Sequence, residues 1–143
     1  MKKIGFVGVG IMGKSMVRNL MKAGFEVSIY TRTKSKVEDV IGEGAIWCDS
    51  VAECAKGRDA VISIVGYPKD VIEVYFGPAG ILANADPGTY VIDMTTTSPK
   101  LAVQIFDEAE KLGLHAIDAP VTGGDSGAKA GTLTILAGGK KED

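Results

Sequence analysis

Short apolar runs alternate with amphipathic stretches along most of this chain. The run from Asp59 to Val65 is apolar at nearly every position, a pattern typical of a central parallel strand that is covered on both faces. Between Ile11 and Ala23 the large apolar residues recur every three or four positions, which predicts a helix with one buried face. Gly24 follows at once, where a glycine commonly ends a helix.

The same criteria predict strands and helices in alternation. Strands are expected at Lys3–Val7, Val27–Thr31, Ala45–Cys48, Asp59–Val65, Tyr90–Met94, Leu114–Asp118 and Thr132–Ala137. Helices are expected at Ile11–Ala23, Ser35–Ile41, Ser50–Ala55, Lys69–Tyr75 and Ser98–Leu112, with Ser50 as an N-cap. This alternation predicts one α/β domain over residues 1–143. Its doubly wound parallel sheet would have the strand order 3-2-1-4-5-6, extended by the strand near residues 132–137.

Composition and charge narrow the class of function. Nineteen glycines among 143 residues, without a three-residue period, indicate specific backbone positions that need glycine. The net charge of −2 argues against a nucleic-acid partner, and no apolar run approaches the ~20 residues of a membrane span. The first residues also lack the pattern of a signal peptide. Cys48 and Cys54 are expected to be free thiols, which favours a reducing, cytoplasmic compartment.

The segment Gly8-Val9-Gly10-Ile11-Met12-Gly13 has the glycine spacing that binds the phosphates of a dinucleotide. It follows one expected strand and opens an expected helix, which is the context that gives this otherwise weak motif its meaning. The first glycine makes a tight turn, the second lets the backbone approach a pyrophosphate, and the third lets helix and strand pack closely. The motif predicts a Rossmann dinucleotide-binding domain, and a glycine-rich turn without a ligand is the alternative.

The end of the second expected strand bears on the choice between NADP and NAD. An NAD-binding domain usually carries an acid there for the ribose 2′-hydroxyl, whereas this chain has Arg32, Thr33 and Lys36. Arg32 can hold a 2′-phosphate through its planar guanidinium, Thr33 can donate a hydroxyl, and Lys36 adds charge. The segment favours NADP and leaves NAD possible, and a solvated run of charge is the alternative.

Further strand ends supply candidate ligand contacts, because ligands of such sheets sit beyond the carboxyl ends of the strands. Val65, Gly66 and Tyr67 follow the fourth strand, and Thr96 lies in the hydroxyl-rich segment after the fifth. Thr122, Gly123 and Gly124 follow the sixth, where backbone N–H groups would form a cradle for a substrate carboxylate. Simple turns are the alternative at these positions.

Other candidate chemistry is sparse. His115 is the one histidine, and it is expected to be a surface or structural residue because it starts a strand, away from the ligand edge. Asp93 and Asp118 are expected to hold loops rather than transfer protons. The sequence shows no metal-binding pattern and no catalytic triad arrangement.

The motifs taken together resemble those of the β-hydroxyacid dehydrogenases, whose cofactor domain is similar to the NAD-binding domain of 6-phosphogluconate dehydrogenase. This group contains 3-hydroxyisobutyrate dehydrogenase, tartronate semialdehyde reductase and the glyoxylate/succinic semialdehyde reductases. Its blocks are matched in order by Gly8-x-Gly10-x-Met12-Gly13, by Asp93-Met94 with Thr96 and Pro99, by Asp118 to Gly124, and by Gly131-Thr132-Leu133 with Gly138-Gly139. Thr95 and Thr122 stand where the family pattern has serine, and both keep the hydroxyl.

The resemblance implies a function for the blocks. The residues Gly8 to Gly13, Arg32 and Thr96 would contact NADP or NAD, and Thr122, Gly123 and Gly124 would bind the substrate carboxylate. The family's catalytic residue is a lysine in a Gly-x-x-x-Lys-x-x-x-Asn pattern that this chain does not contain, so no catalytic residue is assigned before residue 143. The family's C-terminal all-helical domain, which closes the site and mediates dimerisation, is also expected to lie outside this chain.

The resulting expectation is the cofactor domain of an oxidoreductase. The whole protein would transfer a hydride between NADP(H) and a small 3-hydroxy acid or its semialdehyde, and it would be a homo-oligomer. The isolated 143 residues would bind cofactor without turnover. The alternatives are a non-catalytic domain that senses nucleotides and a pure interaction scaffold. The sequence does not select among the hydroxy acids of this family.

Overall fold

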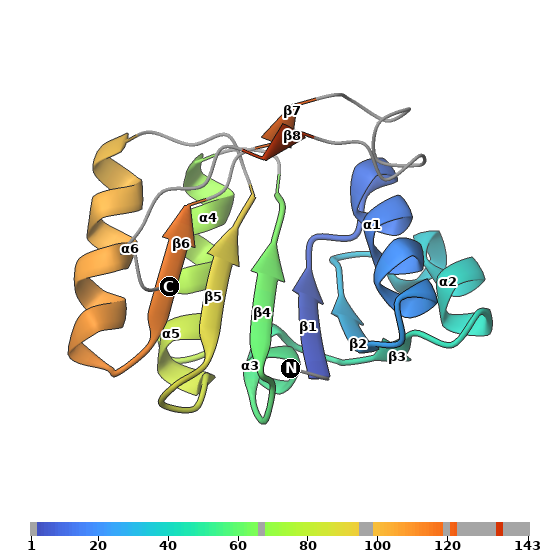
Figure 1. Cartoon of the computed structure of the whole chain (residues 1–143), viewed down its shortest axis with the longest axis horizontal. Helices are drawn as coiled ribbons and strands as arrows, with labels where there is room; N and C mark the ends of the chain where they lie inside the picture. The colour runs from blue at the N-terminus through green and yellow to red at the C-terminus, as the bar shows by residue number, and fades with distance from the viewer. Residues whose placement is uncertain (1–2, 66–67, 95–98, 119–120, 123–133, 136–143) are drawn as a thin grey trace.

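A computed structural model describes residues 3–65, 68–94, 99–118, 121–122 and 134–135. The described residues form a parallel sheet in the order β3-β2-β1-β4-β5-β6, which confirms the predicted order (Figure 1). Its strands are β1 (Lys3–Val7), β2 (Glu26–Tyr30), β3 (Ile46–Trp47), β4 (Ala60–Ser63), β5 (Tyr90–Asp93) and β6 (His115–Asp118). The helices are α1 (Ile11–Lys22), α2 (Glu38–Gly42), α3 (Val51–Ala55), α4 (Pro68–Tyr75), α5 (Ile81–Asn84) and α6 (Pro99–Lys111).

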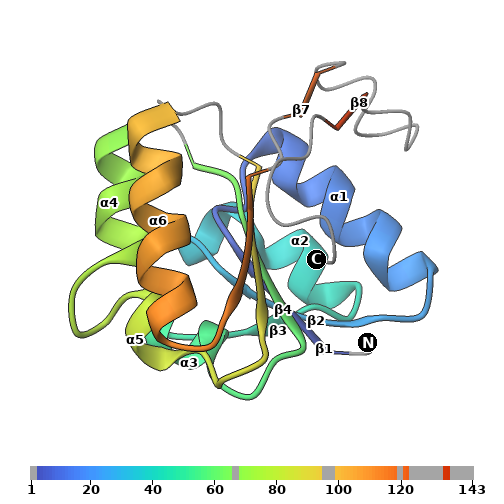
Figure 2. The same cartoon turned by 60° about the vertical axis from the view of Figure 1, so that its left-hand side comes forward.

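Helices cover both faces of the sheet, as Figure 2 shows from the side. The helices α1 and α2 lie on one face, and α3, α4, α5 and α6 lie on the other. Alternate residues of each strand supply the two cores: Ile4 and Phe6 of β1 belong to the cluster under α1 and α2, and Val7 belongs to the opposite cluster. All four residues of β4 are buried, as its apolar run predicts.

The parallel register aligns the carboxyl ends of the strands in one row. Val7 pairs with Tyr30 on one side and with Ser63 on the other. Ser63 pairs with Asp93, and Asp93 pairs with Asp118. The chain runs outward from β1 to β3 and then returns to β4 beside β1, so the strand order reverses between β1 and β4. Such a switch point is where open α/β sheets bind ligands.

The structure differs from the expected elements in several places. The predicted helix from Ser35 to Ile41 is divided by Val37 into a 3-10 turn, η1 (Lys34–Lys36), and α2. The short helix α5 lies in a stretch for which no element was predicted. The other predicted strands of the main sheet and the other predicted helices are found, with boundaries that differ from the predicted ones by at most two residues.

The strand expected near residues 132–137 does not extend the parallel sheet. Its described part, β8 (Thr134–Ile135), pairs antiparallel with β7 (Val121–Thr122) in a separate two-stranded sheet. β7 follows β6 closely in the chain, and the 11 residues between β7 and β8 suffice for antiparallel pairing, whereas a parallel crossover needs about a dozen or more residues and usually contains a helix. The nearby strand β7 therefore offers the simpler pairing.

In the part of the chain that the structure describes, no helix is long and apolar enough to cross a membrane.

Gly5 and Gly42 provide a matched test of this packing. A Cβ atom at Gly5 would collide with the backbone carbonyl of Cys54, where α3 passes over β1, whereas a Cβ at Gly42 would meet no atom within 4 Å. We expect Gly5→Ala to lower the free energy of unfolding by about 1–3 kcal/mol because the core has no room for it. Gly42→Ala at the end of α2 should leave it unchanged or raise it by up to ~1 kcal/mol. Urea denaturation measures both, and an equal effect of the two substitutions would contradict this packing.

Candidate functional site

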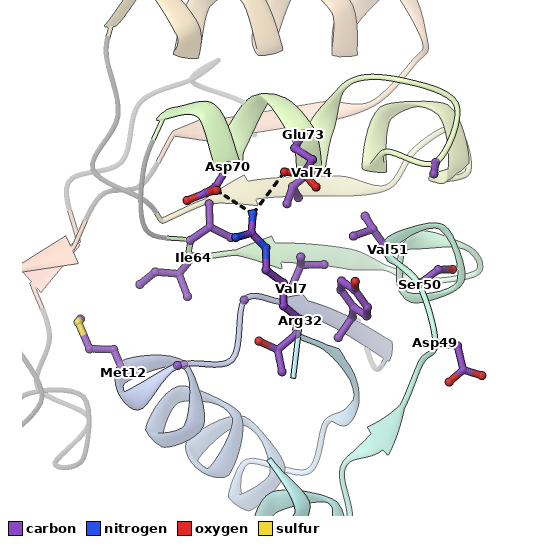
Figure 3. Close-up of a pocket in the computed structure, with 17 residues that line it drawn as sticks. Val7, Met12, Arg32, Asp49, Ser50, Val51, Ile64, Asp70, Glu73 and Val74 are labelled. Carbon is purple, nitrogen blue, oxygen red and sulfur yellow. Dashed lines mark hydrogen bonds and ion pairs between the residues drawn. The ribbon is translucent and has the colours of Figure 1, made fainter. Parts of the chain in front are cut away.

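A cavity of about 700 Å³ opens at the carboxyl ends of the strands, at the point where the strand order reverses. One side is formed by Gly8 and Gly10, in the turn between β1 and α1, and by Met12 and Gly13, in the first turn of α1. The other walls come from the ends of β2, β3 and β4 and from α4 (Figure 3). The volume lies within the ~300–1,000 Å³ range of small-molecule and cofactor pockets.

Two glycines of the turn are required by the fold itself. Gly8 has a φ of 92°, and a side chain there would also collide with the carbonyl oxygen of Ile64, the residue that follows the neighbouring strand β4. A Cβ atom at Gly13 would lie 2.8 Å from the carbonyl oxygen of Gly8, so the first turn of α1 can approach β1 only without one. Both positions match the roles that the sequence motif predicts.

Gly10 differs from both, because nothing in the part of the chain that the structure describes requires it to be glycine. Its φ is −89°, and a Cβ atom there would meet no atom within 4 Å. It lines the cavity and is the N-cap of α1. A glycine that the fold does not need, facing an open cavity, fits a ligand that must approach the backbone closely.

The start of α1 is an uncapped helix N-terminus at this cavity. No side chain caps the helix, and its first turn contains no acidic residue. The N–H of Gly10 donates to the carbonyl of Gly8, so the donors available to a ligand are the N–H groups of the first helical turn, residues 11–13. Free N–H groups and the positive end of the helix dipole together favour an anion such as a pyrophosphate.

Asp49, Ser50 and Val51 form a fixed wall of the cavity beyond β3. The Ser50 side chain caps α3 by accepting a hydrogen bond from the N–H of Glu53, as the sequence predicts. The carboxylate of Glu53 accepts in return from the N–H of Asp49. The indole N–H of Trp47 donates to Asp49 over 2.9 Å. These bonds hold the acid of Asp49 at the rim of the cavity.

Arg32 crosses the cavity from the end of β2 and meets two acids of α4 (Figure 3). Its Nη2 atom lies 2.7 Å from Oδ1 of Asp70 and 3.3 Å from Oε2 of Glu73. The hydrogen bond to Asp70 and the charges of both acids raise the pKa of Arg32 above its usual value. The Arg32 side chain is 69% exposed, whereas that of Asp70 is only 10% exposed.

A buried polar chain anchors α4 to the sheet below this contact. Ser63 at the end of β4 donates to Oδ1 of Asp93 over 3.1 Å. Its oxygen also lies 2.5 Å from the hydroxyl of Tyr75 in α4. Because Ser63 has one proton and gives it to Asp93, the Tyr75 hydroxyl is the donor to Ser63. Asp93 thus takes part in a buried link between two strands and a helix.

The structure places the sequence-predicted cofactor residues unevenly around the cavity. Those that line it are Gly8, Gly10, Met12, Gly13, Arg32 and Val65. Val9 is 3% exposed and belongs to the core, and Thr33 and Lys36 are exposed residues that are not among those lining the cavity. Gly66, Tyr67, Thr96, Gly123 and Gly124 lie outside the described residues, and Thr122 is described only as backbone of β7. The structure describes the backbone of Ile11 at the start of α1.

Sequence reasoning missed the acids of the cavity, which are Asp49, Asp70 and Glu73. A signal for the latter two was present. Their spacing of three puts them on one face of the predicted helix, and that helix starts at the carboxyl end of a central strand. Their contact with Arg32 joins residues 38 and 41 positions apart, which no local pattern reveals.

Away from this cavity, His115 and a smaller cavity lie at the opposite edge of the sheet. His115 stacks on Tyr90 with ring centroids 4.7 Å apart at the amino ends of β5 and β6, as expected for a structural residue. A smaller cavity of about 360 Å³ lies at that edge, lined by residues that include Asp59, Asp86 and Thr89. Among the residues that the structure describes, no group of three or more His, Cys, Asp or Glu is placed to hold a metal ion.

Cys48 and Cys54 are both buried free thiols. A hydrogen bond with Cys54 and the nearby guanidinium of Arg58 lower the pKa of Cys48 to about 7. The same hydrogen bond, together with burial, raises the pKa of Cys54 well above its usual range. The Arg58 Nη2 atom lies 3.8 Å from the sulfur of Cys48.

Comparison with known proteins places this geometry in a family. Residues 3–143 match the family model described as the NAD binding domain of 6-phosphogluconate dehydrogenase. The uncharacterized oxidoreductase YkwC of Bacillus subtilis is 53% identical over 141 residues, which are 99% of this chain and 49% of YkwC. The chain thus spans about half the length of this curated relative.

Solved structures show the same fold. A 3-hydroxyisobutyrate dehydrogenase of Mycobacterium tuberculosis, solved with L-serine, is 32% identical with a TM-score of 0.92, over 99% of this chain and 48% of that one. Psf3 in complex with NADP+ and 2-OPP is 28% identical with a TM-score of 0.92, over 97% of this chain and 49% of that one. The predicted resemblance to 3-hydroxyisobutyrate dehydrogenase-like enzymes is confirmed.

Proposed function

The chain belongs to the family of the NAD binding domain of 6-phosphogluconate dehydrogenase, and on that premise we propose that it is the cofactor domain of an oxidoreductase. The whole protein would transfer a hydride between NADP(H) and a small 3-hydroxy acid or its semialdehyde. The relatives are oxidoreductases, among them the 3-hydroxyisobutyrate dehydrogenase of Mycobacterium tuberculosis. We propose that the substrate is a small molecule, that the whole protein is a homo-oligomer, and that the family's all-helical domain belongs to it.

The single observation that carries this proposal is the turn from Gly8 to Gly13. Gly8 and Gly13 serve the fold, whereas Gly10 leaves open backbone at an uncapped helix N-terminus inside the cavity. Neither a scaffold nor an ordinary turn needs a glycine at position 10. The first-turn N–H groups fit the pyrophosphate of a dinucleotide, and the apolar side chains of Val51 and Val65 in the lining suit the flat face of a base.

The remaining roles follow from the proposed domain. The nicotinamide cofactor, when bound, supplies the hydride chemistry. This chain's part is to bind and orient it, with Val65, Gly66, Tyr67 and Thr96 proposed as further contacts. Thr122, Gly123 and Gly124 are proposed to bind the substrate carboxylate. The general acid/base would be a lysine beyond residue 143, because the chain lacks the family's lysine pattern.

NADP is the proposed preferred cofactor. Arg32 stands at the end of β2, where an acid would select NAD. Its bonds to Asp70 and Glu73 both use Nη2, so the N–H groups of Nε and Nη1 are not used by these two bonds. A structural relative, Psf3, was solved with NADP+. Thr33 and Lys36 are proposed to add a hydroxyl and a positive charge beside the 2′-phosphate.

A substitution at Gly10 separates binding from folding. Asp is a favoured N-cap next to a helix dipole, so Gly10→Asp should keep or raise the free energy of unfolding. Its carboxylate would occupy the first-turn N–H groups and repel a pyrophosphate, so the affinity for NADPH and NADH should fall at least about tenfold. Calorimetric titration and urea denaturation measure the two effects.

The matched control is Gly8→Ala, which should lower stability because of its φ of 92° and the contact with Ile64. If Gly10→Asp bound NADPH as tightly as the unsubstituted chain, the proposed pyrophosphate site would be wrong.

Arg32→Ala tests the cofactor preference. We expect the affinity for NADPH to fall roughly tenfold, or ~1.5 kcal/mol, the low end for a hydrogen bond to a charged group because the side chain is exposed. The affinity for NADH should change less than about twofold. Arg18→Ala is the control, since Arg18 is also exposed and also pairs with two acids, Asp39 and Glu43, but does not line the cavity. Equal losses for NADPH and NADH would contradict a 2′-phosphate role.

The 143 residues alone are expected to bind cofactor without catalysis. An assay of NADP+ or NAD+ reduction with 3-hydroxyisobutyrate or L-serine should show no rate above background, because the proposed proton acceptor is absent from this sequence. Turnover by this chain that disappears on Gly10→Asp would show that a catalytic base lies within residues 1–143.

A further inference from the structure

The guanidinium that is proposed to recognise the 2′-phosphate is already held by acids of α4. Arg32 comes from the end of β2, and Asp70 and Glu73 come from the first two turns of α4, on the other side of the cavity (Figure 3). Both contacts use the same nitrogen, Nη2, at 2.7 and 3.3 Å. Looking in the sequence for an acid at the end of β2 does not reveal this arrangement, because the acids belong to α4.

We propose that Asp70 and Glu73 are specificity-determining residues that weaken the selection for NADP. The inference rests on the proposed function, because it concerns the same cofactor site. By pairing with Arg32 they reduce the advantage that its charge gives to NADPH, so that the chain also accepts NADH. The preference for NADPH is then smaller than Arg32 alone would produce.

The charges around Arg32 disfavour a phosphate. Arg32 contributes one positive charge, and the two acids that it contacts, Asp70 and Glu73, contribute two negative charges, so these acids more than balance the charge of Arg32 before any ligand binds. A 2′-phosphate monoester adds about −1.5 to −2 at neutral pH. It must approach the guanidinium beside both carboxylates. The 2′-hydroxyl of NADH carries no charge and can donate a hydrogen bond to a carboxylate.

The two acids differ in how far their side chains are buried. The Asp70 side chain is 10% exposed and is held by the packing of α4, so it cannot swing away from an incoming phosphate. The Glu73 side chain is 74% exposed and can rotate into solvent. We therefore expect Asp70 to oppose the phosphate more strongly than Glu73, whose effect is screened by water and salt.

Hydrogen bonds between α4 and the sheet hold the helix in place beside Arg32. The Tyr75 hydroxyl, in the last turn of α4, is bonded to Ser63, and Ser63 is bonded to Asp93. Tyr75 itself is fully buried. The helix that carries Asp70 and Glu73 is thus fixed to β4 and β5, and the buried Asp70 keeps its place beside Arg32.

The test compares the affinities of the chain for NADPH and NADH, which differ only in the 2′-phosphate. Glu73→Gln and Asp70→Asn each remove one negative charge and keep nearly the same shape. We expect the affinity ratio of NADPH to NADH to rise about threefold for Glu73→Gln and about five- to tenfold for Asp70→Asn, the factors expected for one unit charge near a phosphate in a wet site. The rise should shrink at high salt.

Glu108→Gln is the matched control. It also removes one negative charge from an exposed acid that pairs with a base, Lys111, but it lies on α6 and does not line the cavity. Its affinity ratio should equal that of the unsubstituted chain. Asp70 is buried and its replacement could unfold the chain, so Glu73→Gln, at an exposed position, decides the question if Asp70→Asn does not fold.

The outcomes are distinct. A ratio that stays constant or falls in the folded variants would overturn the inference, because the acids would then be neutral toward the phosphate or would orient Arg32 for it. In that case binding of both nucleotides by the unsubstituted chain would leave the proposed function intact. If the unsubstituted chain bound neither NADPH nor NADH, the proposed function would fail, and this inference with it.

Discussion

At Gly8 the chain leaves β1 with a φ of 92° and passes so close to the carbonyl of Ile64 that a side chain has no room. The rest of the site depends on this close passage between neighbouring parallel strands. It turns the backbone into α1 directly above the place where the strand order reverses, and it brings the first turn of α1 against β1 at Gly13. The N–H groups at the start of α1 then face the cavity, and the packed sheet below holds them there.

A second constraint is the ion pairing at another part of the cavity, between a base that follows β2 and two acids of α4. Arg32 at the end of β2 is met by Asp70 and Glu73 on α4, and α4 is tied to the sheet by Tyr75 through Ser63. A helix N-terminus suited to an anion thus lies in the same cavity as a paired guanidinium. We propose that the first feature serves any dinucleotide, whereas the second adjusts which dinucleotide is accepted.

Much of this arrangement could be predicted from the sequence, because it rests on local patterns. The alternation of strands and helices, with the apolar run of β4 at its centre, predicted the strand order. The spacing of glycines from Gly8 to Gly13 predicted the edge of the sheet at which the cavity opens. The pairing of β8 with β7 could not be predicted, since pairing depends on which edge lies near. The helix α5 is only four residues long and follows a glycine and a proline, so it leaves almost no periodic pattern. The Arg32–Asp70 contact joins residues 38 positions apart and depends on the folded geometry alone.

The most direct test of the account is a nuclear magnetic resonance titration of the ¹⁵N-labelled chain with NADPH. We expect the amide signals of residues 11–13 and the side-chain signal of Arg32 to shift together and to saturate. The amides of Asp59, Asp86 and Thr89, at the small cavity on the opposite edge of the sheet, should not move and serve as an internal reference. Shifts confined to that opposite edge, or no saturable shift at residues 11–13, would contradict the assignment of the Gly8–Gly13 turn as a dinucleotide site.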